Sequence, residues 1–447
     1  MRLHTRPDAA RRSRRGVILL GAALMASALA ACNSLLDVPV PSRIPANSIE
    51  NPSNAVLLTN GAISDFDCAL GSFIVVGAEL TDEFEDATAT AARWVYDKRD
   101  VPTDNERYAV NDCDAEGTYV PINRARASAD NVLRILNAAS DSEVPSGVNR
   151  GDLIATLYPY AGYARVLLGE MFCSAVISTL NPDHTVTYGT ELTPQQVFQS
   201  ADSMFTLGIA AAQASGNTDA LNMSYIGRAR ARLDLGEYDL AKADAQQVTD
   251  PDYVHVATAS ATTTRRANRV YGESNTTGTA SSVGPRYQGM TYDGVADPRV
   301  QAVATGKTTS RGLVEWAQLK YTDPSTPIPI ASYDEAQLII AEADARANDT
   351  PGAIAIIDAL HTKAGIPTYT AAGGATDQAS VLSQIVEERS RELFLEGQRL
   401  YDVIRFDLAL QPAENTPYRN GGVYGPAGAA LCLKLPDVER QNNPNLQ

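Results

Sequence analysis

One ordered series of aromatic, small and glycine residues constrains the fold of this 447-residue chain more than any other feature. Between residues 225 and 248 the series consists of Tyr225, Ala229, Gly236, Tyr238, Ala241 and Val248. This order is typical of a tetratricopeptide unit: small residues let two antiparallel helices approach, a glycine turns the chain, and aromatic rings fill the gap to the next unit. The segment therefore predicts a pair of packed helices.

Similar helical patterns lie on both sides of this segment. Apolar residues at helical spacing predict helices over about residues 52–70, 127–139, 152–179 and 333–364. A further helix should begin at Thr193, because Pro194 suits a first turn and Gln196 completes a capping box. The chain is therefore expected to be all-α, with tetratricopeptide-like helical pairs over about residues 127–248 and 331–405.

Two long stretches, about residues 80–118 and 258–330, interrupt the helical pattern. They are rich in Asp, Thr, Ser, Gly and Asn, yet they also contain tryptophan and tyrosine. Loops of this length inside a compact protein are usually functional or disordered. Because aromatic residues favour order and contact, these stretches are predicted to form an irregular half of the protein that faces a ligand.

The N-terminus has the pattern of a bacterial lipoprotein signal. Six arginines precede an apolar run of 16 residues from Gly16 to Ala31, and Leu29-Ala30-Ala31-Cys32 forms the cleavage box. The run is shorter than the roughly 20 residues that a spanning helix needs. Residues 1–31 are therefore expected to be removed and Cys32 to be acylated as a membrane anchor. The alternative is an ordinary secretory signal followed by a chance cysteine.

Charge and cysteine content narrow the possible partners. The net charge is −16, and removal of six arginines and one aspartate with residues 1–31 leaves −21, so nucleic acid is not an expected partner. Four cysteines remain, which in an oxidising compartment favours two disulfides among three possible pairings. We favour Cys68 with Cys113 and Cys173 with Cys432, and buried free thiols are the alternative. No metal site is predicted, because the sequence has no CxxC motif and its histidines lie far apart.

A charged helix is predicted near the C-terminus, where residues 388–405 read ERSRELFLEGQRLYDVIR. Leu393, Gly397 and Leu400 continue an apolar stripe, and Glu387 with Arg391 forms a favourable ion pair. Glu392 and Glu396 have the residue type of the carboxylate pairs of glycosidases. Alternating charge along one helix is more often a solvated or ion-paired face, so no catalytic residue is predicted and the chain is not expected to be an enzyme.

This C-terminal helix resembles the ER-x-x-EL-x-x-EG-x-R-x-x-D-x-x-R signature of the SusD/RagB family of outer-membrane lipoproteins. Further segments follow in family order: Leu36-Asp37-Val38-Pro39, the first long helix over 119–136, Asp297-Pro298-Arg299, Lys320-Tyr321 and Asn443-Pro444-Asn445-Leu446. The chain departs from the family at Asp358, where asparagine is usual, and at Leu433-Lys434-Leu435-Pro436. The resemblance is therefore to a divergent member, and it covers nearly all of residues 32–447.

The resemblance implies a single SusD-like domain over residues 32–447, with helical repeats packed against irregular loops. It also implies a cell-surface lipoprotein of the outer membrane that captures oligosaccharides or other nutrients and passes them to a SusC-like TonB-dependent barrel, without a cofactor. Ligand contacts in the family fall largely in the irregular half, which here points to Arg93, Trp94, Tyr96, Tyr287 and Tyr292. Each of these residues also has an alternative role as a loop anchor in the core.

A second function fits the helical repeats equally well at this point. A tetratricopeptide lipoprotein could serve as a scaffold for outer-membrane assembly, since such repeats are common recognition surfaces. That function predicts no small-molecule cleft and disordered loops, whereas a nutrient-binding protein needs both a cleft and ordered loops.

Overall fold

The computed structural model describes residues 46–113, 116–275 and 279–447, and the chain divides into two units at residue 50. The described part of the first unit contains α2 (Ala46–Ile49). The predicted lipidation site Cys32, the predicted signal peptide 1–31 and residues 36–39 lie outside the described residues. The second unit, residues 51–447, contains all the other elements.

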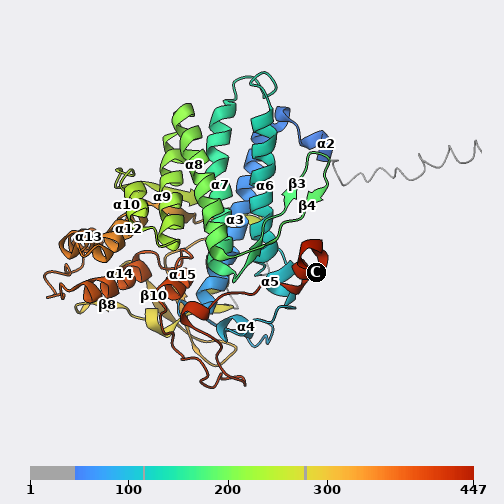
Figure 1. The fold of residues 1–447 in the computed structure, drawn as a ribbon. Helices are drawn as coiled ribbons and strands as arrows, with labels where there is room; N and C mark the ends of the chain where they lie inside the picture. Colours follow the sequence, from blue (N-terminus) through green and yellow to red (C-terminus); the bar gives the residue numbers. More distant parts are fainter. Residues whose placement is uncertain (1–45, 114–115, 276–278) are drawn as a thin grey trace, which may run out of the picture. The chain divides into compact units, whose positions relative to one another are not determined.

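Long helices make up most of this second unit, and neighbours in the chain pack on one another (Figure 1). In Figure 1, α3, α6, α7 and α8 stand side by side, and the contacts continue through α9 and α10 to α12, α13 and α14. The helices are α3 (Ala55–Leu80), α4 (Trp94–Asp97), α5 (Glu106–Val110), α6 (Tyr119–Ala138), α7 (Arg150–Met171), α8 (Pro194–Ser215), α9 (Thr218–Asp234), α10 (Tyr238–Ala245), α11 (Arg269–Ser274), α12 (Tyr333–Arg346), α13 (Thr350–Ala364), α14 (Gln378–Glu392), α15 (Arg399–Arg405) and α16 (Asp437–Asn442). The predicted all-α class and helical-repeat architecture are confirmed.

The strands are short and form antiparallel two-stranded ladders, which pair β1 with β7, β2 with β5, β3 with β4, β6 with β12, β8 with β9 and β10 with β11. Most lie in or beside the two stretches predicted to be irregular. Their bounds are β1 (Phe84–Asp86), β2 (Ala175–Val176), β3 (Thr179–Leu180), β4 (Val186–Thr187), β5 (Glu191–Leu192), β6 (Val254–Ala257), β7 (Ser281–Val283), β8 (Thr291–Tyr292), β9 (Val295–Ala296), β10 (Ala302–Thr308), β11 (Val314–Gln318) and β12 (Ile328–Ser332). The irregular half is thus ordered by local hairpins and by β1–β7, which joins its two stretches.

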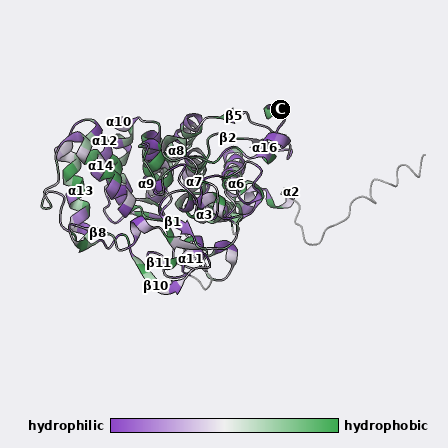
Figure 2. Ribbon diagram, turned by 90° about the horizontal axis from the view of Figure 1, so that it is seen from below, coloured by the Kyte–Doolittle hydropathy of each residue, from purple (hydrophilic) through white to green (hydrophobic). Residues whose placement is uncertain are grey.

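Helix α3 is the central helix of the second unit. It continues ten residues beyond the predicted end at Leu70, and its C-terminal part from Cys68 to Leu80 is buried. By length and composition alone this helix could cross a membrane, but its contacts with α6, α7 and α11 place it in the protein core. Hydrophobic and hydrophilic residues alternate along the surrounding helices, as expected for helices with one buried face (Figure 2).

Helices α7, α8 and α9 approach closely around one aromatic ring. Phe205 of α8 is fully buried, and its ring lies against Gly162 of α7 and Gly227 of α9. A β-carbon at either glycine would overlap the ring. Two glycines outside the predicted series, Gly162 and Gly227, therefore admit an aromatic side chain from the neighbouring helix.

The predicted start of α8 is confirmed in atomic detail. Thr193 Oγ1 accepts a hydrogen bond from the Gln196 N–H at 3.4 Å, and Gln196 Oε1 accepts one from the Thr193 N–H at 2.9 Å. The prediction for α7 was too long, because this helix ends at Met171 and not near residue 179. There the backbone pairs with the C-terminal segment instead: the Leu433 N–H donates to the Met171 carbonyl and the Cys173 N–H to the Leu433 carbonyl, both at 2.8 Å.

Two disulfides form in the favoured pairing. Cys68 in α3 is bonded to Cys113, which lies after α5, and Cys173 is bonded to Cys432 beside the backbone pairing at Leu433. The first closes the excursion that carries β1, α4 and α5, and the second joins the C-terminal segment to the end of α7.

The single helix predicted over residues 388–405 is wrong, because the structure has α14 up to Glu392 and α15 from Arg399. Between them Leu395 and Gly397 adopt left-handed backbone conformations, with φ of 55° and 86°. The Leu395 N–H donates to Glu83 Oε1 at 2.8 Å, and the Leu395 carbonyl accepts from the Tyr321 hydroxyl at 3.0 Å. Contacts from distant parts of the chain therefore stabilise the break.

The charges of this C-terminal motif form a buried network and not a solvated face. Arg389 Nε donates to both carboxylate oxygens of Asp402 at 2.8 and 2.9 Å. Arg405 donates to Glu342 of α12 at 2.8 Å and to Asp402 at 2.7 Å. The predicted pair of Glu387 and Arg391 is present at 3.8 Å. The motif thus joins α12, α14 and α15 through ion pairs.

Close packing at Gly227 gives a first prediction. Gly227→Ala should lower the free energy of unfolding by about 1–3 kcal/mol, because the added methyl group displaces the Phe205 ring from a full core. Chemical denaturation monitored by circular dichroism measures this change. The matched control is Gly61→Ala in α3, where the new methyl group meets no atom within 4 Å and should stabilise by up to about 1 kcal/mol. Equal effects of the two substitutions would contradict the packing argument.

Glu83 gives a second prediction, on the pH dependence of stability. Complete burial raises the pKa of Glu83 from 4.5 to about 8, so the folded protein keeps a proton that the unfolded chain releases between these values. The stabilisation is complete below about pH 4.5 and is lost as the pH rises through this window, at about 1.4 kcal/mol per pH unit.

The variant Glu83→Gln should remove this contribution, because glutamine stays neutral and its oxygen still accepts from Leu395. Urea denaturation at pH 5, 6, 7 and 8 should give a flatter pH profile for Glu83→Gln than for the wild type. Glu143→Gln changes an exposed carboxylate and should leave the wild-type profile unchanged. Parallel profiles of wild type and Glu83→Gln would show that Glu83 is ionised in the folded protein.

Candidate functional site

A cavity of about 580 Å³ lies in the irregular half of the second unit. One wall follows the end of α3 through β1 to the end of α4 and consists of Thr81, Asp82, Phe84, Glu85, Asp97 and Arg99. The second wall comes from η4 (Pro285–Tyr287) and its flanking residue, and from the chain after α15. It consists of Gly284, Pro285, Arg286, Ala409, Gln411, Pro412, Arg419 and Tyr424. This size is within the range of small-molecule binding sites.

The acidic residues of the cavity are each paired with an arginine. Asp82 accepts two hydrogen bonds from Arg399, at 2.7 and 2.8 Å. Glu85 accepts from Arg419 at 2.9 Å, and Asp97 accepts from Arg311 at 2.9 Å. Burial is the largest influence on Glu85 and raises its pKa above the ordinary value. These pairs make the wall polar while they neutralise its carboxylates.

Arg99 and Tyr424 form the aromatic and cationic corner of the cavity. The Arg99 guanidinium lies 5.0 Å from the centre of the Tyr424 ring, and its Nη2 donates to the Pro412 carbonyl at 2.6 Å. The Gly425 N–H donates to the Lys98 carbonyl at 2.8 Å, which fixes the chain after α4 against the C-terminal segment. The two walls are therefore joined by backbone as well as side-chain contacts.

A second hollow of about 350 Å³ adjoins the cavity. It shares Arg286 and Ala409 with the cavity and continues along α14 past Leu382 and Val386. The two hollows are therefore neighbours on either side of these shared residues.

The structure places the predicted ligand residue Arg93 in a buried ion cluster, away from the cavity lining. Its guanidinium binds Glu79 of α3 at 2.8 Å, Asp86 of β1 at 3.0 Å and Glu273 of α11 at 3.1 Å, and it also binds Glu116. Burial is the largest influence on Glu79 and raises its pKa to about 8. Arg93 is therefore engaged by carboxylates in the protein interior.

The four predicted aromatic residues also lie outside the cavity lining. Tyr96 and Tyr287 are fully buried, and the Tyr287 ring stacks on Phe394 at 4.8 Å. Trp94 is half-buried and donates its indole N–H to the Thr88 carbonyl at 3.0 Å. Tyr292 in β8 is half-buried against His361 at 4.4 Å. The contacts of these side chains are with the protein itself, as the alternative role of loop anchors predicts.

The predicted ligand residues are neighbours in the chain of residues that line the cavity, and none of them lines it. Arg93, Trp94 and Tyr96 lead directly to Asp97 and Arg99, and Tyr287 follows the lining residue Arg286. The segment from 409 to 424 was overlooked entirely. In this segment Tyr418 and Tyr424 lie on either side of Gly421 and Gly422. It is an aromatic-bearing loop like the two stretches 80–118 and 258–330.

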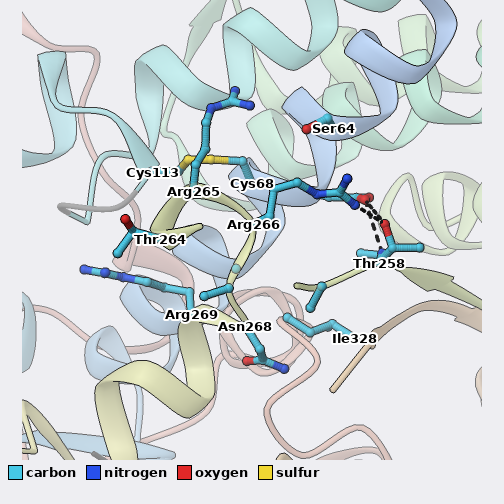
Figure 3. Close-up of a pocket in the computed structure, with 15 residues that line it drawn as sticks. Ser64, Cys68, Cys113, Thr258, Thr264, Arg265, Arg266, Asn268, Arg269 and Ile328 are labelled. Atoms are coloured by element: carbon cyan, nitrogen blue, oxygen red, sulfur yellow. Dashed lines mark hydrogen bonds between the residues drawn. A yellow bond between two sulfur atoms is a disulfide. The ribbon is translucent and has the colours of Figure 1, made fainter. Parts of the chain in front are cut away.

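A smaller pocket lies beside the Cys68–Cys113 disulfide (Figure 3). Its volume of about 20 Å³ is enough for roughly one water molecule. Thr258 donates to Asp67 from its hydroxyl at 2.9 Å and accepts from Arg266 at 2.6 Å. Burial raises the pKa of Asp67 to about 6. This pocket is too small for a nutrient molecule.

One group of described residues has the spacing of a metal site, namely Cys68, Asp112 and Cys113. A disulfide joins the two sulfur atoms, and the Asp112 carboxylate binds Arg124 at 3.0 Å. The donor atoms are therefore already engaged, and this group does not fit a metal in the oxidised protein.

The Arg93 cluster gives a third prediction. Arg93→Met should lower the free energy of unfolding by about 3–5 kcal/mol, because it leaves buried carboxylates without a counter-charge. The control is Arg124→Met, which breaks an exposed pair with Asp112 and should cost at most about 1 kcal/mol. Guanidinium denaturation measures both changes. If Arg93→Met leaves stability unchanged and abolishes ligand binding, Arg93 contacts the ligand and the prediction is wrong.

Comparison with known proteins identifies the fold and a family match within the chain. The family model described as "SusD family" matches residues 259–429, which include one wall of the cavity and the break between α14 and α15. A search of curated protein sequences finds no match.

Solved structures extend the similarity over nearly the whole chain. A SusD-like carbohydrate binding protein from Bacteroides vulgatus is 16% identical and superposes with a TM-score of 0.67, covering 89% of this chain and 97% of the other. A SusD superfamily protein from Parabacteroides distasonis is 13% identical with a TM-score of 0.64, covering 91% and 99%. Surface glycan-binding protein A from Bacteroides uniformis is 13% identical with a TM-score of 0.61, covering 88% and 98%. Residues 259–429 therefore match the SusD family, and the described chain shares the fold of SusD-like proteins.

Proposed function

We propose that this protein is a cell-surface nutrient-binding lipoprotein that captures an oligosaccharide in the 580 Å³ cavity and passes it to a SusC-like TonB-dependent outer-membrane transporter. The observation that carries the proposal is the cavity itself, which presents a tyrosine ring and arginine side chains between two ordered walls. Acylation of Cys32 would keep the binding domain at the membrane, close to the transporter.

The composition of the cavity supports saccharide binding. A sugar ring presents an apolar face that packs on an aromatic side chain, and hydroxyl groups that pair with planar polar side chains. Tyr424 supplies a ring, and Arg286, Arg419 and Gln411 supply planar hydrogen-bonding groups. The names of two structural neighbours, a carbohydrate binding protein and a glycan-binding protein, point in the same direction.

The proposal does not give the protein a catalytic role. Glu85 and Asp97 line the cavity, but each accepts a hydrogen bond from an arginine. A carboxylate paired in this way is a weak proton donor or acceptor for a substrate. The expected behaviour is saturable binding without turnover.

The cavity also supports binding over the alternative function as an assembly scaffold. A scaffold of helical repeats needs no small-molecule cleft and no ordered loops. Here the β1–β7 ladder and the β10–β11 hairpin order the loop regions. A cavity of ligand size is lined by residues of these regions and of the chain after α15.

The test is binding to a panel of oligosaccharides by the mature chain carrying Cys32→Ala, followed by isothermal titration of the ligands found. Tyr424→Ala should weaken binding by about tenfold through loss of the aromatic face. Tyr188→Ala is the control, because this tyrosine is exposed and does not line the cavity. Binding that Tyr424→Ala leaves unchanged would move the ligand site elsewhere, and release of cleaved sugar would contradict a purely binding role.

A further inference from the structure

Arg99 differs from the other arginines of the cavity in having no acidic partner. Arg419 binds Glu85, and Arg286 binds Glu387. Arg99 makes no ion pair with any residue in the described ranges, and its guanidinium donates one hydrogen bond, from Nη2 to the Pro412 carbonyl. Its Nε is buried without a partner. The nearest carboxylates that act on it electrostatically, Asp97 and Glu414, do so without contact.

This unpaired cation is buried. Arg99 is 4% exposed, and burial is the largest influence on its pKa, which is lowered. In contrast, nearby acidic groups raise the pKa of Arg311 and of Arg399. Burial of a charge without a counter-ion is costly, so the fold contains a charge that its own carboxylates do not balance.

The backbone of Arg99 is fixed in an uncommon conformation. Its φ of 59° lies in the left-handed region, which a non-glycine residue adopts when its surroundings enforce it. The surroundings are Gly425, where a β-carbon would overlap the Arg99 carbonyl, and the hydrogen bond from Gly425 to Lys98. The guanidinium is therefore presented to the cavity from a rigid position beside Tyr424.

The acidic residues of the cavity cannot supply the missing partner. Asp82 is engaged by Arg399, Glu85 by Arg419 and Asp97 by Arg311. With these pairs neutral, Arg99 leaves the wall with a local positive charge in a chain whose net charge is −16. A bound anionic molecule would supply the negative charge that balances it.

We infer that the cavity takes an acidic saccharide, in which the carboxylate of a uronic acid unit pairs with Arg99 beside Tyr424. A planar guanidinium matches a carboxylate through paired N–H donors, and a second planar face beside it suits a ring substituent. The inference rests on the proposed function and adds the chemical class of the ligand.

The experiment compares an acid with its neutral ester, so that charge is the variable. The mature Cys32→Ala protein is titrated with oligomers of galacturonate, mannuronate and glucuronate, and with the methyl ester of each. At least one acid should bind roughly tenfold or more tightly than its ester. A higher salt concentration should weaken binding of the acid and leave binding of the ester unchanged.

Variants then assign the preference to one residue. Arg99→Gln should bring the affinity for the acid down to that for the ester, and Arg99→Lys should restore part of the difference because it retains the charge without the planar fork. Arg440→Gln, which removes an exposed arginine paired with Glu191 outside the cavity, should keep the full preference. Circular dichroism and thermal unfolding establish that each variant is folded, and the comparison of acid with ester in the wild type stands without any variant.

The outcomes separate this inference from the proposed function. Neutral oligosaccharides or esters that bind as tightly as the acids would overturn the acidic ligand and leave the saccharide-binding function intact. Tighter binding of a sulfated oligosaccharide than of every uronate would overturn the carboxylate. Absence of binding to every acidic, neutral and sulfated oligosaccharide would overturn the proposed function itself.

Discussion

The buried guanidinium of Arg93 is the interaction on which the rest of the irregular half depends. It joins Glu79 in the central helix α3 to Asp86 in β1, Glu273 in α11 and Glu116 before α6. These four acidic residues are separated by up to 194 positions in the sequence, from 79 to 273. Because one arginine contacts them all, the loops are connected to the helical repeats through an ion cluster and not through apolar packing alone.

The position of the cavity follows from this cluster. Arg93 is the N-cap of α4. Asp97 at the end of this helix and Arg99 just after it line one cavity wall. Tyr418 connects the second wall to the end of α4, because its hydroxyl donates to Asp97 at 3.1 Å and accepts from Arg311 at 2.7 Å. The residue expected to contact ligand thus acts one step earlier, because it fixes the helix from which the lining residues come.

Local signals in the sequence predicted local structure well. The capping box at Thr193 depends on residues within one helical turn. The break at Leu395 depends instead on Glu83 and Tyr321, which no local pattern could associate with it. The same limit applies to Tyr96 and Tyr287, since an aromatic residue in a loop gives no indication of whether its ring faces a cavity or the core.

The two disulfides have a joint consequence for the durability of the cavity. One closes the ring of residues 68–113 and the other the ring of residues 173–432, and every lining residue of the cavity lies inside one of them. A protease that cuts one peptide bond within either ring produces two ends but no separate fragment. Each wall of the cavity would remain covalently part of the molecule after such a nick.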